Sequence, residues 1–124
     1  MTVLKTRLTP ALLVRDLSAT LDFYQTLGFV VTGAYPDAAA PTWAEVTRDG
    51  LWLQFHTEPP RGTPPTPMFS GTLYFYSSDV AALADAWRGQ VMFAWGPEQM
   101  PYGAFEFGLQ DPNGYFLGFS DACD

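Results

Sequence analysis

The chain has 124 residues, of which 13 are acidic and 6 are basic, so its formal net charge is −7. This length suits one ordinary domain, and the negative field repels phosphate backbones and anionic lipid surfaces. We therefore expect a single domain whose partners include neither nucleic acid nor a membrane.

The first half of the chain predicts a strand, a helix and three further strands. Residues 8–15 are mostly apolar and β-compatible, and they lead to Asp16, a residue type that favours the N-cap of a helix. Gly28 is placed to end that helix. Between them, apolar residues recur at helical spacing: Leu17, Leu21, Tyr24 and Leu27. Strands are expected at 29–32, 43–47 and 51–56, with a loop at 33–41 and a turn at 48–50.

A proline-rich stretch divides the sequence near its middle. Five prolines between Glu58 and Met68 exclude a helix or a central strand there. We therefore place a linker at residues 58–69, between a first module at about 6–57 and a second module at about 70–121.

The second half predicts the same order of elements. Asp79 is an expected N-cap, and Gly89 is placed to end the helix that follows. The apolar stripe of that helix consists of Val80, Leu83, Ala84 and Trp87. Strands are expected at 71–77, 91–94, 104–109 and 115–119, with a loop at 96–103 and a turn at 111–114.

The two halves are also similar to one another in sequence. Residues 49–55 align with 113–119 at an offset of 64, and residues 11–17 align with 74–80 at an offset of 63. Two matches in the same order at nearly the same offset indicate a duplicated supersecondary unit. The predicted fold class is α+β, with two tandem βαβββ modules related by a pseudo-twofold axis.

Four short motifs resemble one known family. Residues 14–17 (VRDL), 23–24 (FY), 27–29 (LGF) and 111–115 (DPNGY) are similar to motifs of the vicinal oxygen chelate superfamily. That superfamily includes glyoxalase I, extradiol dioxygenases, and the bleomycin and fosfomycin resistance proteins. The resemblance extends from about residue 8 to residue 120, and in length, acidity and tryptophan content the chain is most similar to the bleomycin resistance type.

The resemblance implies that each module curls into a half-barrel, that two modules enclose a cavity, and that the helices lie outside. Metal enzymes of the family carry ligands on the first and last strands of each module, positions that correspond here to Thr9, Gln54, Thr72 and Gly118. Two hydroxyls, an amide and a glycine cannot hold a divalent ion. We therefore expect no metal and no cofactor, and we expect Gly118 to leave space where a metal enzyme has a carboxylate.

Alternation of side chains along strands selects candidate ligand contacts in the first half. The only histidine, His56, is expected to share a face with Trp52 and Gln54. It could hydrogen-bond to a ligand or act as a general base, but no serine, cysteine or carboxylate lies at the spacing of a catalytic motif. No catalytic residue is therefore assigned.

Aromatic residues supply most of the other candidates. Tyr74 and Tyr76 alternate with apolar residues on one strand, so both are expected to face the cavity. Their rings suit a heteroaromatic ligand, and tryptophans suit a planar cation attracted by Glu45, Glu98 or Glu106. The predicted ligand-binding residues are Trp43, Trp52, Gln54, His56, Thr72, Tyr74, Tyr76, Trp95, Tyr102, Phe105 and Phe116.

Three functions remain open from the sequence. The first is a metal-independent protein that sequesters an aromatic or cationic, antibiotic-like small molecule. The second is a glyoxalase-like or dioxygenase-like lyase or isomerase with a divergent metal site, and the third is an interaction module whose cavity is filled by its own rings. We expect a homodimer in each case. The single cysteine, Cys123, and the absence of a signal-peptide pattern favour a cytoplasmic protein.

Overall fold

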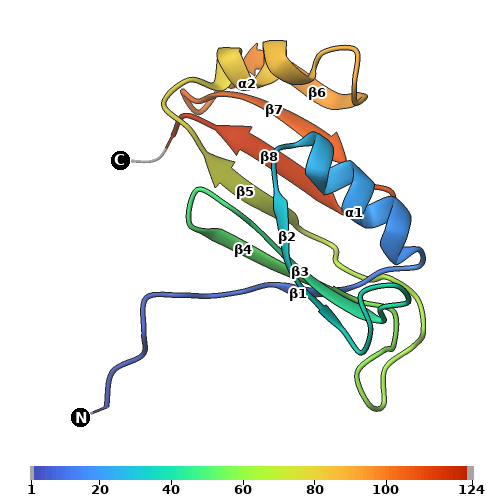
Figure 1. The fold of residues 1–124 in the computed structure, drawn as a ribbon. Coiled ribbons are helices and arrows are strands. Elements are labelled where there is room, and N and C mark those ends of the chain that lie inside the picture. The colour runs from blue at the N-terminus through green and yellow to red at the C-terminus, as the bar shows by residue number, and fades with distance from the viewer. Residues whose placement is uncertain (1, 123–124) are drawn as a thin grey trace. The chain divides into compact units, whose positions relative to one another are not determined.

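A computed structural model of the protein describes residues 2–122, so Cys123 lies outside the described part of the chain. The chain divides after Pro67 into two compact units, and each unit contains one βαβββ module (Figure 1). The predicted α+β class and the two modules are therefore confirmed. Within residues 2–122, neither helix is long and apolar enough to cross a membrane.

The first unit contains a four-stranded mixed sheet and one helix. Its elements are β1 (Ala11–Leu13), α1 (Leu17–Thr26), β2 (Val30–Tyr35), β3 (Trp43–Arg48) and β4 (Leu51–His56). The strand order is β1-β4-β3-β2, with β1 parallel to β4 and the other pairs antiparallel. Tyr24 of α1 is fully buried and contacts Phe55 of β4, with 4.7 Å between ring centroids. This contact places the core of the unit between the helix and one face of the sheet.

The residues at the two ends of α1 are those that the sequence predicts. The side chain of Asp16 accepts a hydrogen bond from the backbone N–H of Ala19 at 3.0 Å, which satisfies a donor in the first turn. At the other end Gly28 adopts a φ of 92°, a conformation that glycine reaches without steric cost. The chain then turns back into β2.

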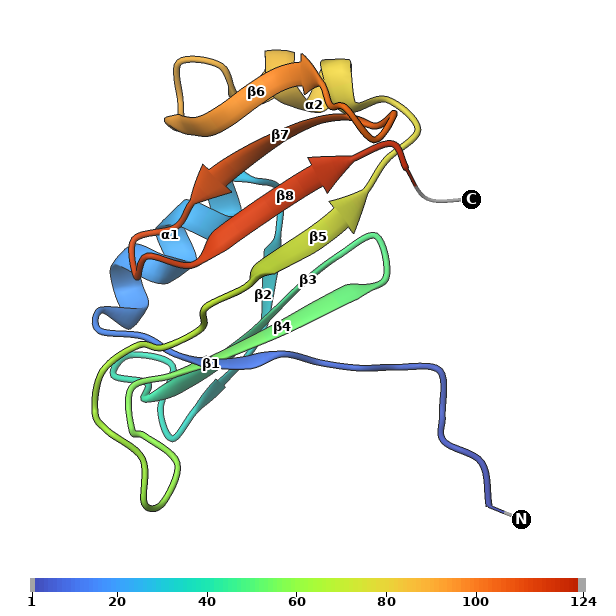
Figure 2. The same cartoon turned by 180° about the vertical axis from the view of Figure 1, so that it is seen from behind.

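The second unit repeats this arrangement. Its elements are β5 (Thr72–Tyr76), α2 (Val80–Trp87), β6 (Phe93–Gln99), β7 (Phe105–Gln110) and β8 (Phe116–Ser120). The strand order is β5-β8-β7-β6, and Figure 2 shows these strands side by side. Trp87 of α2 packs edge-on against Phe107 and Phe119. One face of this sheet therefore forms the core with α2, and residues of the opposite parity point to the other face.

Two edge strands extend at least three residues beyond their predicted ends. The strand predicted to end at Thr32 continues to Tyr35, and the strand predicted to end at Ala94 continues to Gln99. Both β2 and β6 are edge strands, and both contain register shifts in their pairing. A glycine or proline that would break a central strand is tolerated at a bulged edge. The predicted loops at 33–41 and 96–103 are therefore partly wrong.

Candidate functional site

A carboxylate lies on the sheet face of the second unit that is opposite α2. Glu106 is on β7, and the next residue, Phe107, packs against Trp87 on the helix side. Strand alternation therefore directs Glu106 to the opposite face. Only 1% of Glu106 is exposed, which is unusual for an acidic side chain and requires polar partners.

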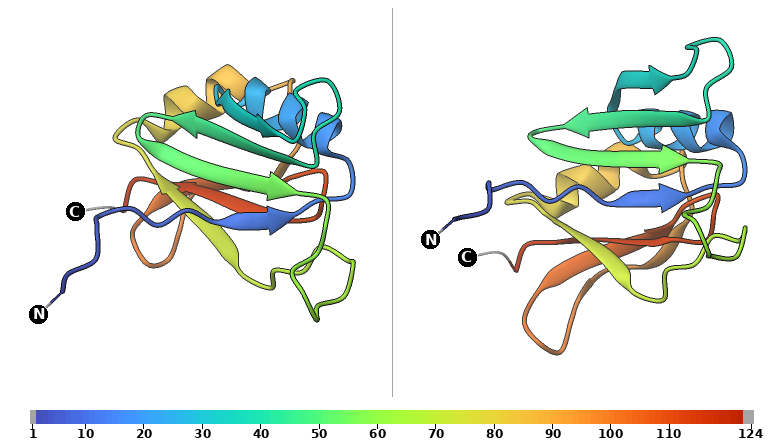
Figure 3. Two further views of the ribbon diagram at one scale, coloured as in Figure 1. Left: turned by 60° about the horizontal axis from the view of Figure 1, so that its bottom comes forward. Right: turned by 90° about the horizontal axis from the view of Figure 1, so that it is seen from below.

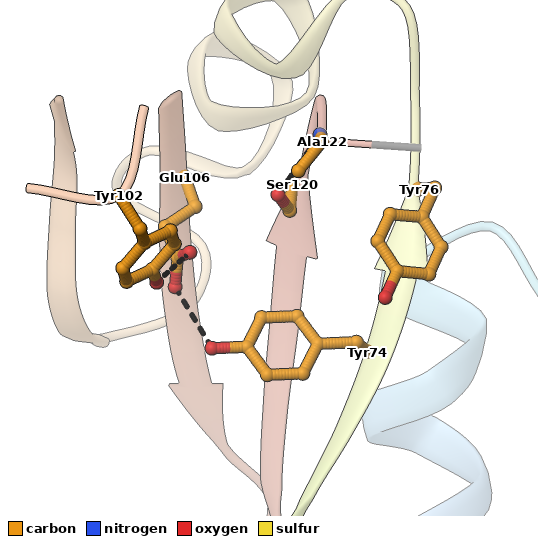
Figure 4. Close-up of a pocket in the computed structure, with 6 residues that line it drawn as sticks. All are labelled: Tyr74, Tyr76, Tyr102, Glu106, Ser120 and Ala122. Carbon is orange, nitrogen blue, oxygen red and sulfur yellow. Dashed lines mark hydrogen bonds between the residues drawn. The ribbon is translucent and has the colours of Figure 1, made fainter. Parts of the chain in front are cut away.

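Three neutral donors supply those partners. The hydroxyl of Tyr74 donates to Oε2 of Glu106 at 3.1 Å (Figure 4), and the indole N–H of Trp95 donates to the same oxygen at 2.9 Å. The hydroxyl of Tyr102 donates to Oε1. The donors come from β5, from β6 and from the loop between β6 and β7, so the carboxylate joins three segments of the unit.

Two glycines allow these rings to lie close to the sheet. Gly108 of β7 and Gly118 of β8 face each other directly in the antiparallel pairing. A Cβ added to Gly118 would lie 2.5 Å from Cε1 of Tyr74, and one added to Gly108 would overlap the ring of Trp95. The expectation that Gly118 leaves free space is therefore wrong, because the ring of Tyr74 fills that space.

The carboxylate lines an open pocket of about 350 Å³. Tyr74 and Tyr76 stand on β5 with their rings nearly parallel, at 21° and 6.4 Å between centroids. Tyr74 is 42% exposed, so its ring remains accessible although its hydroxyl is bonded to Glu106. The residues lining the pocket are Tyr74, Tyr76, Tyr102, Glu106, Ser120 and Ala122 (Figure 4).

The carboxylate also changes the acidity of two tyrosines. Its hydrogen bond with Tyr102 is the largest cause that raises the pKa of the Tyr102 hydroxyl well above its usual value of 10. Burial raises the pKa of Tyr74, and Glu106 adds to that effect. An ionised phenol beside a carboxylate is disfavoured by like-charge repulsion. Both hydroxyls are thus held in the neutral form, which donates hydrogen bonds.

The first unit brings four predicted residues to one face of its sheet. Trp43 pairs with His56 in the register of β3 and β4, and Trp52 and Gln54 share the parity of His56. Gln54 donates to Oε2 of Glu45 at 3.1 Å. Nδ1 of His56 lies 2.7 Å from the carbonyl oxygen of Glu58.

Three further predicted residues, Thr72, Phe105 and Phe116, lie on strands of the second unit. Phe116 contacts Trp95 at 6.2 Å between ring centroids, and Thr72 pairs with Phe116 in the register of β5 and β8. Phe105 directly precedes Glu106 on β7, so alternation directs its side chain to the other face. None of these three lines the pocket around Glu106.

Sequence reasoning named Glu106 only as an accessory charge, although the structure places it at the centre of the site. A usable signal was present, because the residues on both sides of Glu106 are phenylalanines. A single carboxylate inside an apolar strand indicates a buried charge with specific partners. Ser120 and Ala122 at the pocket wall carried no comparable signal.

The residues at the family's metal positions do not fit a metal ion. Oγ1 of Thr9 accepts from Arg7, the amide of Gln54 donates to Glu45, and Gly118 is covered by Tyr74. Within residues 2–122 no group of three or more histidine, cysteine, aspartate or glutamate side chains could hold an ion. A divalent ion needs about three such ligands.

Comparison with known proteins gives one family and several similar structures. The sequence profile described as "Glyoxalase/Bleomycin resistance protein/Dioxygenase superfamily" matches residues 7–119. A bleomycin resistance determinant encoded on the transposon Tn5 is 26% identical, with a TM-score of 0.70 over 94% of this chain and 98% of that chain. No curated protein sequence matches significantly.

Two further structures are similar in fold. One is a bleomycin-binding protein complexed with bleomycin, which is 22% identical with a TM-score of 0.69, covering 96% of this chain and 100% of that chain. The other is TnmS3, an antibiotic-binding protein from Streptomyces sp. CB03234, which is 22% identical with a TM-score of 0.76, covering 98% of each chain. At this level of identity the likeness shows the shared fold.

Proposed function

The chain belongs to the glyoxalase/bleomycin resistance protein/dioxygenase superfamily, and we propose that it binds a small aromatic cation in the pocket around Glu106 without altering it chemically. The observation that carries the proposal is the buried carboxylate of Glu106, which is bonded to neutral donors only. Its role would be to sequester an antibiotic-like molecule, as the descriptions of similar structures suggest.

The hydrogen bonds of Glu106 offset the cost of burial but leave its charge in place. A carboxylate has about four lone-pair sites, and three neutral donors leave it with a net negative charge. Among the described residues, no lysine, arginine or histidine is paired with it. A charge that is shielded from water and has no counter-ion attracts a cation more strongly than a surface carboxylate does.

The rings around the carboxylate favour a flat ligand. Tyr74 and Tyr76 are nearly parallel and exposed, so they offer two apolar surfaces on which a heteroaromatic ring can stack. A positive charge on that ligand is further attracted to the faces of the rings. The pocket therefore combines shape selection by the tyrosines with charge selection by Glu106.

The chemistry of the pocket supports binding rather than turnover. The raised pKa values of Tyr74 and Tyr102 make both hydroxyls donors, so neither is a suitable general base near neutral pH. The residues at the family's metal positions do not suit the Lewis-acid chemistry of a glyoxalase-like or dioxygenase-like enzyme.

Isothermal titration calorimetry with two probes, bleomycin and the planar cationic dye proflavine, tests this function. We expect saturable binding of at least one probe, with one site per chain. Glu106→Gln should weaken that binding about 10- to 100-fold, since a charged hydrogen-bonding partner contributes about 1.5–3 kcal/mol. Glu58→Gln, which removes the same charge at an exposed position, should leave the affinity unchanged.

Failure of both probes to bind would count against the proposed ligand class. Equal affinity in the wild-type protein and in Glu106→Gln would count against Glu106 as the recognition group. Metal dependence provides an additional measurement, because the proposed binding should persist unchanged in excess chelator.

We also propose that the protein acts as a homodimer. Met68 and Met92 are large apolar side chains that remain mostly exposed in the single chain. Such surface is commonly covered by a second copy. Sedimentation equilibrium should give twice the chain mass, and a monomer at all concentrations would contradict this.

A further inference from the structure

The first unit contains a second arrangement suited to a cation, and the chain's own Arg7 occupies it. The guanidinium carbon of Arg7 lies 3.9 Å from the centroid of the Trp52 ring. Nη2 of Arg7 lies 3.3 Å from Oε2 of Glu45, and Nε donates to Oγ1 of Thr9 at 3.0 Å. The planar cation is therefore stacked on a ring and paired with a carboxylate at the same time.

The residues that receive Arg7 are fixed by the sheet. Glu45 of β3 pairs with Gln54 of β4, and Trp52 is two residues before Gln54 on the same face. The amide of Gln54 and the hydroxyl of Thr32 both donate to Glu45, at 3.1 Å and 3.4 Å. The side chain of Glu45 is only 16% exposed. Hydrogen bonds that do not involve Arg7 therefore hold Glu45 and Gln54, and the register of β4 places Trp52 on the same face. We call Glu45, Gln54 and Trp52 the Trp52 cradle.

Arg7, in contrast, is on a segment with few contacts. Residues 2–10 precede β1 without regular secondary structure (Figure 3). Leu4 and Leu8 are 95% and 87% exposed, so no apolar packing holds the segment beside Arg7. The side chain of Arg7 is itself 46% exposed. Such a segment can leave the cradle at little cost.

We propose that the Trp52 cradle is a binding site for a guanidinium or amidinium group of a small molecule, and that Arg7 is its built-in competitor. A planar delocalised cation can stack on the indole while its N–H groups meet the carboxylate, which a compact ammonium cannot do as well. The cradle shares no residue with the pocket around Glu106. The two sites can therefore be tested separately.

Benzamidinium is a suitable probe, because it carries a planar amidinium on an aromatic ring. Its binding can be followed by NMR through the indole N–H signal of Trp52, assigned by comparison with Trp52→Phe. Arg7→Ala should bind benzamidinium about five- to thirtyfold more tightly than the wild-type protein, since the internal competitor is removed. Glu45→Gln in the same background should abolish that gain.

Lys5→Ala provides the matched control. It removes one positive charge from the same exposed segment without touching the cradle, so it should bind benzamidinium as the wild-type protein does. Equal affinity of Arg7→Ala and Lys5→Ala would overturn the proposal, as would a gain that survives Glu45→Gln.

Arg7→Lys keeps the test decisive if Arg7→Ala does not fold. Lysine retains the charge beside Glu45 but lacks the planar group that stacks on Trp52. It should therefore compete less well than arginine, and benzamidinium should bind more tightly than to the wild-type protein. An affinity no higher than that of the wild-type protein would overturn the proposal.

Discussion

The ring of Tyr74 lies over Gly118 of the neighbouring strand so closely that a Cβ there would come within 2.5 Å of Cε1. The ring occupies the space that a side chain at position 118 would need. From this position the hydroxyl reaches Oε2 of Glu106 at 3.1 Å. Gly118 therefore acts on the site indirectly, by letting Tyr74 lie flat enough to bond the carboxylate.

Gly118→Ala should destabilise the protein by about 1–3 kcal/mol, because the added methyl group forces Tyr74 away from Glu106. The backbone of Gly118 is not in the left-handed region, so the cost is steric rather than conformational. Urea unfolding measures the effect. In a Tyr74→Ala background the same substitution should cost much less, because the clashing ring is absent.

The double-mutant cycle is decisive for this relationship. If the costs of Gly118→Ala and Tyr74→Ala add within about 0.5 kcal/mol, the two residues act independently. Such a result would contradict the close contact between ring and glycine.

Glu106→Gln should lower the free energy of unfolding by about 1–3 kcal/mol even without ligand. The new amide NH₂ can accept no hydrogen bond, so one of the three donors around Glu106 loses its partner. Urea unfolding followed by far-UV circular dichroism measures the change. Glu58→Gln, an exposed control, should stay within about 0.5 kcal/mol of the wild-type protein, and an equal loss in both variants would contradict the prediction.

The free energy of unfolding should fall at alkaline pH because of the ionisation of Tyr102 and Tyr74. The pKa of each hydroxyl is raised in the folded protein above the usual value of 10, so above that pH the folded state binds more protons than the unfolded state. Their contribution is complete below about pH 10 and is lost as pH rises through the folded pKa values. Urea unfolding between pH 8 and pH 11.5, with tyrosinate absorbance at 295 nm, should show late-titrating tyrosines.

Tyr102→Phe should remove one late-titrating group and flatten the alkaline decline in stability. Tyr35→Phe removes a tyrosine on β2 of the first unit that is not among the hydrogen-bond donors of Glu106 described above, so the late titration should remain. A folded protein in which all six tyrosines ionise together near pH 10 would contradict the assignment.

Elements with local signals were predicted accurately from the sequence. α1 begins after Asp16, which caps its first turn, and the chain leaves the helix at Gly28, which has a positive φ. Both features depend only on residues within a few positions of each other. β6 was predicted too short because Gly96 and Pro97 normally interrupt a strand. Their tolerance depends on β6 lying at the sheet edge with a shifted register, which only the tertiary structure determines.

The candidate site was predictable in composition but not in arrangement. Alternation along one strand predicted Tyr74 and Tyr76 as neighbours on one face, and the structure stacks their rings. The convergence of Trp95, Tyr102 and Tyr74 on Glu106 depends on pairing between strands and on a loop conformation. No sequence period encodes such contacts, so the partners of the central carboxylate could not be assigned from the sequence.

Asp111 lies in the turn between β7 and β8. Asp111→Ala should lower the free energy of unfolding of the second unit by about 1–3 kcal/mol. The side chain is 4% exposed, and its Oδ1 accepts from the backbone N–H groups of Asn113 at 2.8 Å and of Tyr115 at 3.0 Å. Alanine leaves two buried donors without that acceptor, and urea unfolding measures the cost. Asp37→Ala removes one comparable bond, to Ala39, at an exposed turn and should cost under about 1 kcal/mol. Equal costs at the two turns would show that burial of the donors is not what makes Asp111 important.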